Sequence, residues 1–197
     1  AVAERIKINS FMLIVFIYIT IVYPIVGSWQ WGSGFLSTLT EKVGFYDFAG
    51  STLVHSVGGW AALIIISLLG ARKDKFDSSG NPVAIPGSNI PLSAAGVLIL
   101  WLGWFGFNGG SVLSADPANT SLVLVTTCLA AAAGGIGASL LSTLLYKNLD
   151  ITMFMNGILG GLVGITAGAD QMGPTEAIII GSIGGVIVVL GVAFLDK

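Results

Sequence analysis

Six long apolar runs dominate the sequence, and they constrain the fold more than any other feature does. They occupy residues 8–27, 48–70, 90–110, 121–146, 151–168 and 176–194, of which the fifth is the shortest. A helix needs roughly 20 apolar residues to cross the hydrocarbon core of a bilayer. The runs lack the alternation of a membrane β-barrel, which leaves helices as the spanning structure. The sequence therefore predicts an all-α membrane protein with six transmembrane helices.

Composition supports a membrane location and limits the partners. Apolar residues make up 54% of the chain, charged residues 9%, and the mean hydropathy is +0.92. A soluble domain has about 25% charged residues, so this chain could not cover a soluble surface. The net charge of −2 is too small to indicate nucleic acid as a partner. The single cysteine, Cys128, excludes an intrachain disulfide.

The distribution of basic residues predicts the orientation. With six spans, both termini and the loops at residues 71–89 and 147–150 share one side of the membrane. Seven of the eight basic residues lie there: Arg5, Lys7, Arg72, Lys73, Lys75, Lys147 and Lys197. Only Lys42 lies on the other side. By the positive-inside rule both termini are cytoplasmic, and residues 28–46, 111–120 and 170–174 face outward.

Glycines at small-xxx-small spacing recur in the last two runs. They form the sets Gly157/Gly161, Gly160/Gly164/Gly168 and Gly181/Gly185. Such spacing lets helix backbones approach closely in lipid. We interpret these glycines as a packing scaffold.

His55 is the only histidine of the chain, and it lies inside the second apolar run. An ionisable group at membrane depth is by default a functional-site hypothesis. On a regular α-helix, His55 shares a face with Ser51, Gly58, Gly59 and Ala62, which predicts a crevice beside the ring. Desolvation favours the neutral imidazole, which donates from one nitrogen and accepts at the other. The alternative is a structural histidine bonded to a neighbouring helix.

Asp47 opens the same run. Its carboxylate is suited to cap the first helical turn and to complement the helix dipole. The alternative is that it holds a cation or polar groups of a neighbouring segment.

Polar and aromatic residues follow one face of the third run. Trp104, Phe107, Asn108 and Ser111 recur at i, i+3, i+4 and i+7. Tryptophan faces attract cations, and amide and hydroxyl oxygens accept hydrogen bonds from an N–H donor. Trp29 and Trp31 follow the first run, and one of them could wall an outer vestibule. The alternative for these aromatic residues is an interfacial belt, and spacing alone leaves both interpretations open.

No other pattern indicates chemistry. The sequence has no metal-ligand spacing, no nucleophile–base pairing and no phosphate-binding loop. We therefore expect neither an enzyme nor a cofactor or metal.

Two motifs resemble those of a known family. The segment Asp47-Phe-Ala-Gly-Ser-Thr-Leu-Val-His55, running on to Gly70-Ala-Arg72, resembles the signature of ammonium transporters of the Amt/MEP/Rh superfamily. The block from Gly103 to Ser111 is similar to that family's next helix. Residues 3–6 and 160–166 are similar to further family segments. Rh proteins differ in the Asp-Phe-Ala-Gly stretch, so the chain is identified as Amt-like.

The resemblance implies a fold, a function and partners. It implies an eleven-helix protomer with an inverted repeat, assembled as a homotrimer with one pore in each protomer. The six predicted spans correspond to the fourth through ninth family helices. The implied function is transport of ammonium or ammonia across the cell membrane. The implied partners are the lipid bilayer and a PII-type regulator on the cytoplasmic face.

The resemblance also assigns pore residues. His55 matches the first of two facing pore histidines. Phe107 matches one of two stacked gate phenylalanines, and Trp104 matches a pore-wall tryptophan.

Three further positions match the outer mouth of the family's pore. Trp31 and Ser111 match residues of the external ammonium recruitment site. Asp47 matches the family's acid near that site.

The chain also departs from the family pattern. The second pore histidine is expected on a helix after Phe194, and the partner gate phenylalanine on a helix before Ala1. We therefore expect the chain to represent part of a transporter, and half a pore is not expected to conduct. The alternatives are an ammonium sensor module of a signalling protein, a Rh-like gas channel and a structural membrane subunit with a vestigial pore.

Overall fold

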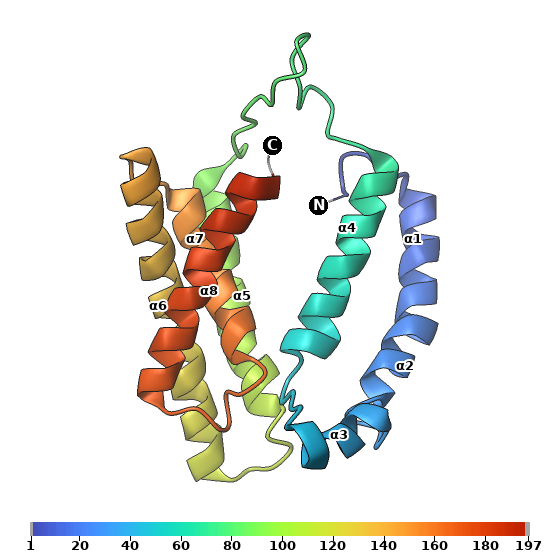
Figure 1. Ribbon diagram of the computed structural model, residues 1–197, viewed down its shortest axis with the longest axis vertical. Helices are drawn as coiled ribbons and strands as arrows, with labels where there is room; N and C mark the ends of the chain where they lie inside the picture. Colours follow the sequence, from blue (N-terminus) through green and yellow to red (C-terminus); the bar gives the residue numbers. More distant parts are fainter. Residues whose placement is uncertain (1, 196–197) are drawn as a thin grey trace. The chain divides into compact units, whose positions relative to one another are not determined.

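The structure, a computed structural model, describes residues 2–195 apart from the side chains of residues 40–43. Within these residues the regular structure is helical, and one isolated bridge joins Phe76 and Pro82 in a loop (Figure 1). The elements are α1 (Ile8–Ile17), the π-helix η1 (Tyr18–Val22), α2 (Tyr23–Ser28), α3 (Phe35–Val43), the π-helix η2 (Ser51–Ser56), α4 (Val57–Leu69), α5 (Ile90–Gly110), α6 (Pro117–Tyr146), α7 (Ile151–Ile165) and α8 (Pro174–Leu195). The predicted all-α class is confirmed. Lys197 and the side chain of Lys42, both used to predict orientation, lie outside the described part.

Five continuous helical segments are long and apolar enough to cross a membrane. They are Ile8–Ser28, Ser51–Leu69, Ile90–Gly110, Pro117–Tyr146 and Pro174–Leu195. Helix α7 has 15 residues, which is about 22 Å at the usual helical rise. That is shorter than a hydrocarbon core of about 30 Å. A crossing at residues 151–168 therefore stays a prediction.

Local capping explains where the helices begin. Helix α6 begins at Pro117, four residues before the expected 121, because the Asp116 side chain accepts the backbone N–H of Ala118 at 3.1 Å. Proline at the first helical position needs no N–H partner. The second span begins at Ser51 rather than at residue 48, after Gly50 with a φ of 114°. Helix α3 was not predicted, because its mixed polarity lacks the apolar run on which the prediction depended.

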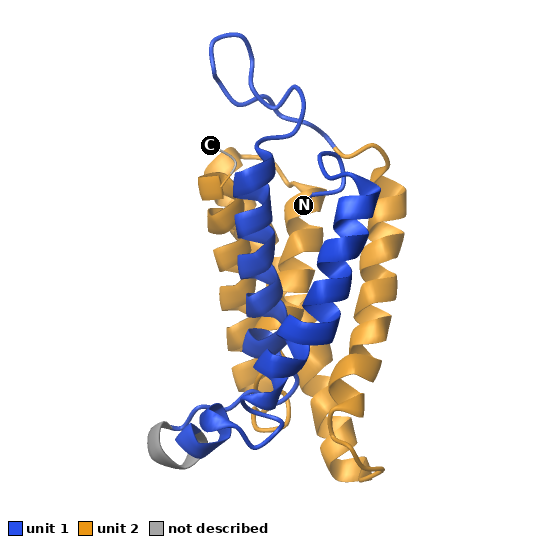
Figure 2. Cartoon of the chain, turned by 90° about the vertical axis from the view of Figure 1, so that its right-hand side faces the viewer, with its two compact units in different colours: residues 1–86 blue, residues 87–197 orange. Residues whose placement is uncertain are grey.

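The chain divides into two compact units, residues 1–86 and residues 87–197 (Figure 2). In the second unit α6 packs on α7 and α8, and α7 also packs on α8. A Cβ atom added at Gly161 would collide with the carbonyl oxygen of Ala130, and one at Gly185 with that of Gly134. The predicted scaffold role is confirmed at these two positions. Gly168 differs, because the nearest atoms there belong to Met172 on the same turn.

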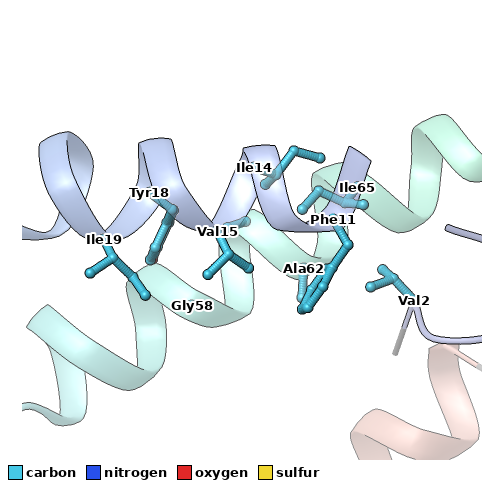
Figure 3. A pocket seen from close by; sticks show the side chains of 10 residues that line it. Val2, Phe11, Ile14, Val15, Tyr18, Ile19, Gly58, Ala62 and Ile65 are labelled. Atoms are coloured by element: carbon cyan, nitrogen blue, oxygen red, sulfur yellow. The ribbon is translucent and has the colours of Figure 1, made fainter. Parts of the chain in front are cut away.

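The first unit is held together mainly at its two ends. At one end α2 contacts η2. At the other end Arg5 donates to the Leu69 carbonyl at 3.1 Å. Arg72 also forms a bidentate ion pair with Glu4 there, at 2.6 and 2.8 Å. Between these ends, α1 and α4 border an apolar groove of about 340 Å³ (Figure 3). Its lining includes Phe11, Val15, Tyr18, Gly58, Ala62 and Ile65.

The first span contains a π-helical turn just before a proline. Pro24 has no N–H for the helical ladder, and η1 ends two residues before it. The Thr20 hydroxyl donates to the Phe16 carbonyl at 2.7 Å and so satisfies one group in this irregular stretch. The widened turn thus has an identifiable cause in the sequence.

Candidate functional site

The first group of candidate residues surrounds the start of η2. The Asp47 carboxylate, only 2% exposed, accepts four backbone N–H groups. One oxygen accepts Gly50 at 2.8 Å and Ser51 at 3.0 Å, and the other accepts Thr52 and Leu53 at 2.9 Å each. The predicted capping role is confirmed. Because both oxygens already accept two hydrogen bonds, direct cation binding by this carboxylate would have to displace amide donors.

Trp31 is fixed against the same residue. Its indole Nε1–H donates to the backbone carbonyl of Asp47 at 3.0 Å, and the side chain is 45% exposed. Gly50 permits this approach, because a Cβ atom there would lie 3.3 Å from the Trp31 ring. The structure therefore brings Trp31 and Asp47 together. The hydrogen bond fixes the orientation of the indole while the residue stays partly exposed.

His55 lies in the π-helical turn, and this changes its expected neighbours. The backbone N–H groups of Val54 and His55 both donate to the Gly50 carbonyl, at 3.1 and 3.0 Å. An i→i−5 bond widens the turn, so regular α-helical spacing does not hold across it. The groove that contains Gly58 and Ala62 does not include the half-buried His55 in its lining. The π-helical turn changes the position of His55 relative to Ser51, and the predicted crevice beside the imidazole stays a prediction.

The second group of candidate residues lies in the second unit, on α5. The rings of Trp104 and Phe107 meet edge to face with centroids 5.9 Å apart. The Trp104 Nε1–H donates to Thr166 Oγ1 at 2.8 Å, and the Thr166 hydroxyl donates to the Leu162 carbonyl at 2.7 Å. Trp104 also packs against the buried cluster that includes Leu162. These contacts favour protein packing over a lipid-facing belt for Trp104, whereas Phe107 is 40% exposed.

Ser111 and Asn108 add polar groups one turn apart. The Ser111 hydroxyl donates to the Phe107 carbonyl at 2.8 Å, which leaves the oxygen as an acceptor. Asn108 is completely buried, and its Nδ2 donates to Thr127 Oγ1 at 3.0 Å. On α6 the neighbouring Thr126 hydroxyl donates to the Ala169 carbonyl at 2.8 Å.

Sequence reasoning missed the two threonines that hold these side chains. Thr127 and Thr166 are both fully buried. The available signal was a hydroxyl inside an apolar helix, which needs a hydrogen-bond partner when buried. Spacing along α5 could not name that partner, because it lies on another helix.

Metal chemistry finds no support in the described residues. No group of three or more His, Cys, Asp or Glu side chains among them could hold a metal ion.

The chain matches the Ammonium Transporter Family over residues 1–197. It is 42% identical to the ammonium transporter Amt2 of Archaeoglobus fulgidus, over 100% of this chain and 43% of that protein. It is 43% identical to a putative ammonium transporter of Synechocystis, over 100% of this chain and 45% of that protein.

Solved structures give the same result. A structure described as a sensor Amt protein has a TM-score of 0.86 at 39% identity and covers 91% of this chain and 45% of its own. Saccharomyces cerevisiae Mep2 has a TM-score of 0.84 at 30% identity and covers 97% of this chain and 42% of its own.

The helices and the comparisons define a multi-pass integral membrane protein. The chain belongs to the ammonium transporter family. It spans less than half the length of the relatives it matches.

Proposed function

We propose that the full-length protein moves ammonium or ammonia across the cell membrane. The observation that carries this proposal is the indole of Trp31, held by the Asp47 carbonyl and 45% exposed. Tryptophan is the best aromatic partner for a cation, and a pre-oriented ring loses little side-chain entropy on binding. Membership of the ammonium transporter family supports ammonium as that cation.

Residue roles follow from the family resemblance. Trp31 and the Ser111 oxygen recruit the ion outside, and Asp47 holds the turn that positions Trp31. Moving a full charge through an apolar pathway is costly, so the neutral amine passes Phe107 and the wall formed by Trp104. His55 then hydrogen-bonds the amine and, with a second histidine of the full-length protein, relays the proton.

The assembly and partners belong to the same proposal. We assign the full-length protein an eleven-helix protomer with an inverted repeat, and a homotrimer as its assembly. The termini of this chain face the cytoplasm, where a PII-type regulator binds. The protein acts as a transporter without enzymatic activity, in keeping with the names of its relatives.

The test is uptake of labelled methylammonium, with currents, in liposomes that contain the full-length protein. Trp31→Leu is expected to raise the half-saturating concentration about five- to thirty-fold, the equivalent of one cation–π contact. Trp29→Leu is the matched control, because Trp29 instead packs at a tilt against Phe35 with centroids 5.2 Å apart. Equal effects of the two substitutions would contradict recruitment by Trp31.

The histidine role has its own variant in the same liposomes. His55→Ala is expected to change the flux and the selectivity for ammonium over potassium, because the imidazole handles the deprotonated amine. Unchanged flux and selectivity would overturn the role of His55.

A second candidate function is ammonium sensing. The likeness to a structure described as a sensor Amt protein favours it. A sensor binds ammonium without conducting it, so binding by the full-length protein without flux in the liposomes would select this function.

A further inference from the structure

Asn108 has hydrogen-bonding capacity that its surroundings leave unused. Its side chain is 0% exposed, and its Nδ2 donates to Thr127 Oγ1 at 3.0 Å. Its Oδ1 is buried and accepts no hydrogen bond from any residue within the described part of the chain. A buried amide oxygen without a donor is destabilising. A donor is therefore expected to reach this atom.

Thr127 determines which end of the amide is unused. Thr127 is itself fully buried on α6, and its hydroxyl oxygen accepts the hydrogen bond from Nδ2. With Nδ2 directed to Thr127, the opposite oxygen is presented as an acceptor. The reversed amide would present an NH₂ donor, which cannot bind a cation.

The position of Asn108 places this acceptor among the candidate pore residues of α5. Asn108 follows Phe107 directly and lies on the same helix face as Trp104 and Ser111. The Ser111 hydroxyl hydrogen is engaged by the Phe107 carbonyl, so Ser111 also presents an acceptor. Ser111 is the third residue after Asn108, which places it about 4.5 Å further along the helix axis. The two acceptors thus lie about one helical turn apart on α5, both C-terminal to Phe107.

The chemistry of the substrate fits an acceptor. Ammonium carries N–H donors and no acceptor, and ammonia carries three donors. An ion that has left its water needs oxygen atoms to replace the lost hydrogen bonds. A buried amide oxygen supplies one without adding a charge to the apolar interior.

We propose that Asn108 Oδ1 is a further substrate-binding group, which accepts a hydrogen bond from ammonium, ammonia or methylammonium next to Ser111. Thr127 is its positioning residue. This inference rests on the proposed function and adds a specificity-determining residue to it.

The experiment uses the full-length protein in liposomes with labelled methylammonium. Asn108→Leu keeps the approximate volume and removes the acceptor, and is expected to raise the half-saturating concentration at least about tenfold, as for loss of a charge-assisted hydrogen bond. Asn108→Asp keeps an acceptor oxygen, because the Thr127 hydroxyl can turn to donate to it. It is expected to hold or lower the half-saturating concentration. Thr127→Val loosens the amide and is expected to give a smaller rise, about threefold.

A purely structural tie between α5 and α6 predicts a different result. It would lower the amount of folded protein and the maximal flux of Asn108→Leu while leaving the half-saturating concentration unchanged, and that outcome overturns the proposal. Asn108→Ser replaces the leucine variant if the latter does not fold. If the wild type binds ammonium without flux, the proposed transport fails. The same variants are then compared by the ammonium-induced rise in melting temperature, where an unchanged rise in Asn108→Leu overturns the role of Asn108.

Discussion

The two units of the chain hold their candidate functional side chains by different means. In the second unit, α6, α7 and α8 meet at glycines so closely that backbone touches backbone, and half of the most apolar stretch of α6 is buried. In the first unit, the spans Ile8–Ser28 and Ser51–Leu69 each have only 6% of such a stretch buried. Order there comes from hydrogen bonds at Asp47 and from the Arg72–Glu4 pair at the opposite end.

The two units should therefore be sensitive to different kinds of substitution. The first unit depends on a few polar groups, so it should be sensitive to the loss of an acceptor. The second unit depends on close backbone approach, so it should be sensitive to the gain of a single methyl group. Substitutions of each kind should therefore affect the stability of the two units differently.

Asp47→Ala should give the largest loss of stability. Four backbone N–H groups lose their acceptor, and at about 1–3 kcal/mol for each group that stays buried the total is several times that of an ordinary cap. The measurement is thermal unfolding of the full-length protein in detergent, followed by tryptophan fluorescence. Asp116→Ala is the control, because its carboxylate caps one backbone N–H, that of Ala118, and should cost about 1 kcal/mol. Equal losses of stability in the two variants would contradict a larger contribution of the Asp47 carboxylate.

Gly185→Ala should destabilise the second unit by about 1–3 kcal/mol or more, as overpacking does. The new Cβ would meet the Gly134 carbonyl and lie 2.9 Å from the Ala138 backbone nitrogen, and neither atom can move aside as a side chain would. Gly191→Ala on the same helix has nothing within 4 Å and should be neutral or slightly stabilising. The readout is the melting temperature of the two variants, and similar values would contradict packing by Gly185.

Thr166→Val should lower stability by about 1 kcal/mol, because it removes the hydroxyl that accepts the half-buried Trp104 N–H. The control is Thr20→Val in the first unit, whose hydroxyl bonds only within its own helix and should change stability by less than about 0.5 kcal/mol. Chemical denaturation of both variants provides the comparison. Unchanged stability of Thr166→Val would mean that packing alone holds the Trp104 ring.

Asp150→Ala should cost about 1 kcal/mol through loss of the α7 cap. The Thr152 hydroxyl first, and then the Thr152 and Met153 N–H groups, lower the pKa of Asp150 from its ordinary value of 3.8. A carboxyl with a lowered pKa stabilises the fold above its unfolded pKa, and that contribution is lost as the pH falls through the folded pKa. The wild type and Asp150→Ala should therefore differ at pH 7 and converge well below pH 3.8. A difference that persists in acid would contradict the charge as its source.

Arg72→Gln should have the smallest effect, less than about 1 kcal/mol, because the Arg72–Glu4 pair is exposed on both sides. Glu4→Gln should match it, and the double variant should cost little more than either one. A double-mutant cycle at low and high salt measures this coupling. A coupling well above 1 kcal/mol would show that this pair, rather than Asp47, dominates the first unit.

Much of the fold could be predicted from the sequence. Apolar runs located every long helix, because backbone groups in lipid must be satisfied within the segment itself. Their ends were shifted by Asp116 and Gly50, whose caps and turns depend on local geometry. The π-helical turn at His55 was missed, because a single i→i−5 bond leaves no periodic signal.

The residues of the candidate site could be predicted from the sequence, but the contacts between them could not. His55, Trp31, Asp47, Trp104, Phe107 and Ser111 were all identified from the sequence pattern and the family resemblance. The bonds from Trp31 to Asp47 and from Trp104 to Thr166 span 16 and 62 residues of sequence. Helical periodicity relates residues only within one helix, so it could not foresee either bond.

Hydropathy and local motifs are properties of neighbouring residues, so they already identify the chain as helical, membrane-spanning and a member of the ammonium transporter family. The tertiary structure then sets which polar atoms are satisfied. Both oxygens of the Asp47 carboxylate accept hydrogen bonds from backbone amides. The indole N–H groups of Trp31 and Trp104 donate to fixed acceptors, whereas Asn108 Oδ1 accepts no hydrogen bond within the described part of the chain. Hydrogen bonds between separate segments depend on how those segments pack, which no single stretch of sequence encodes.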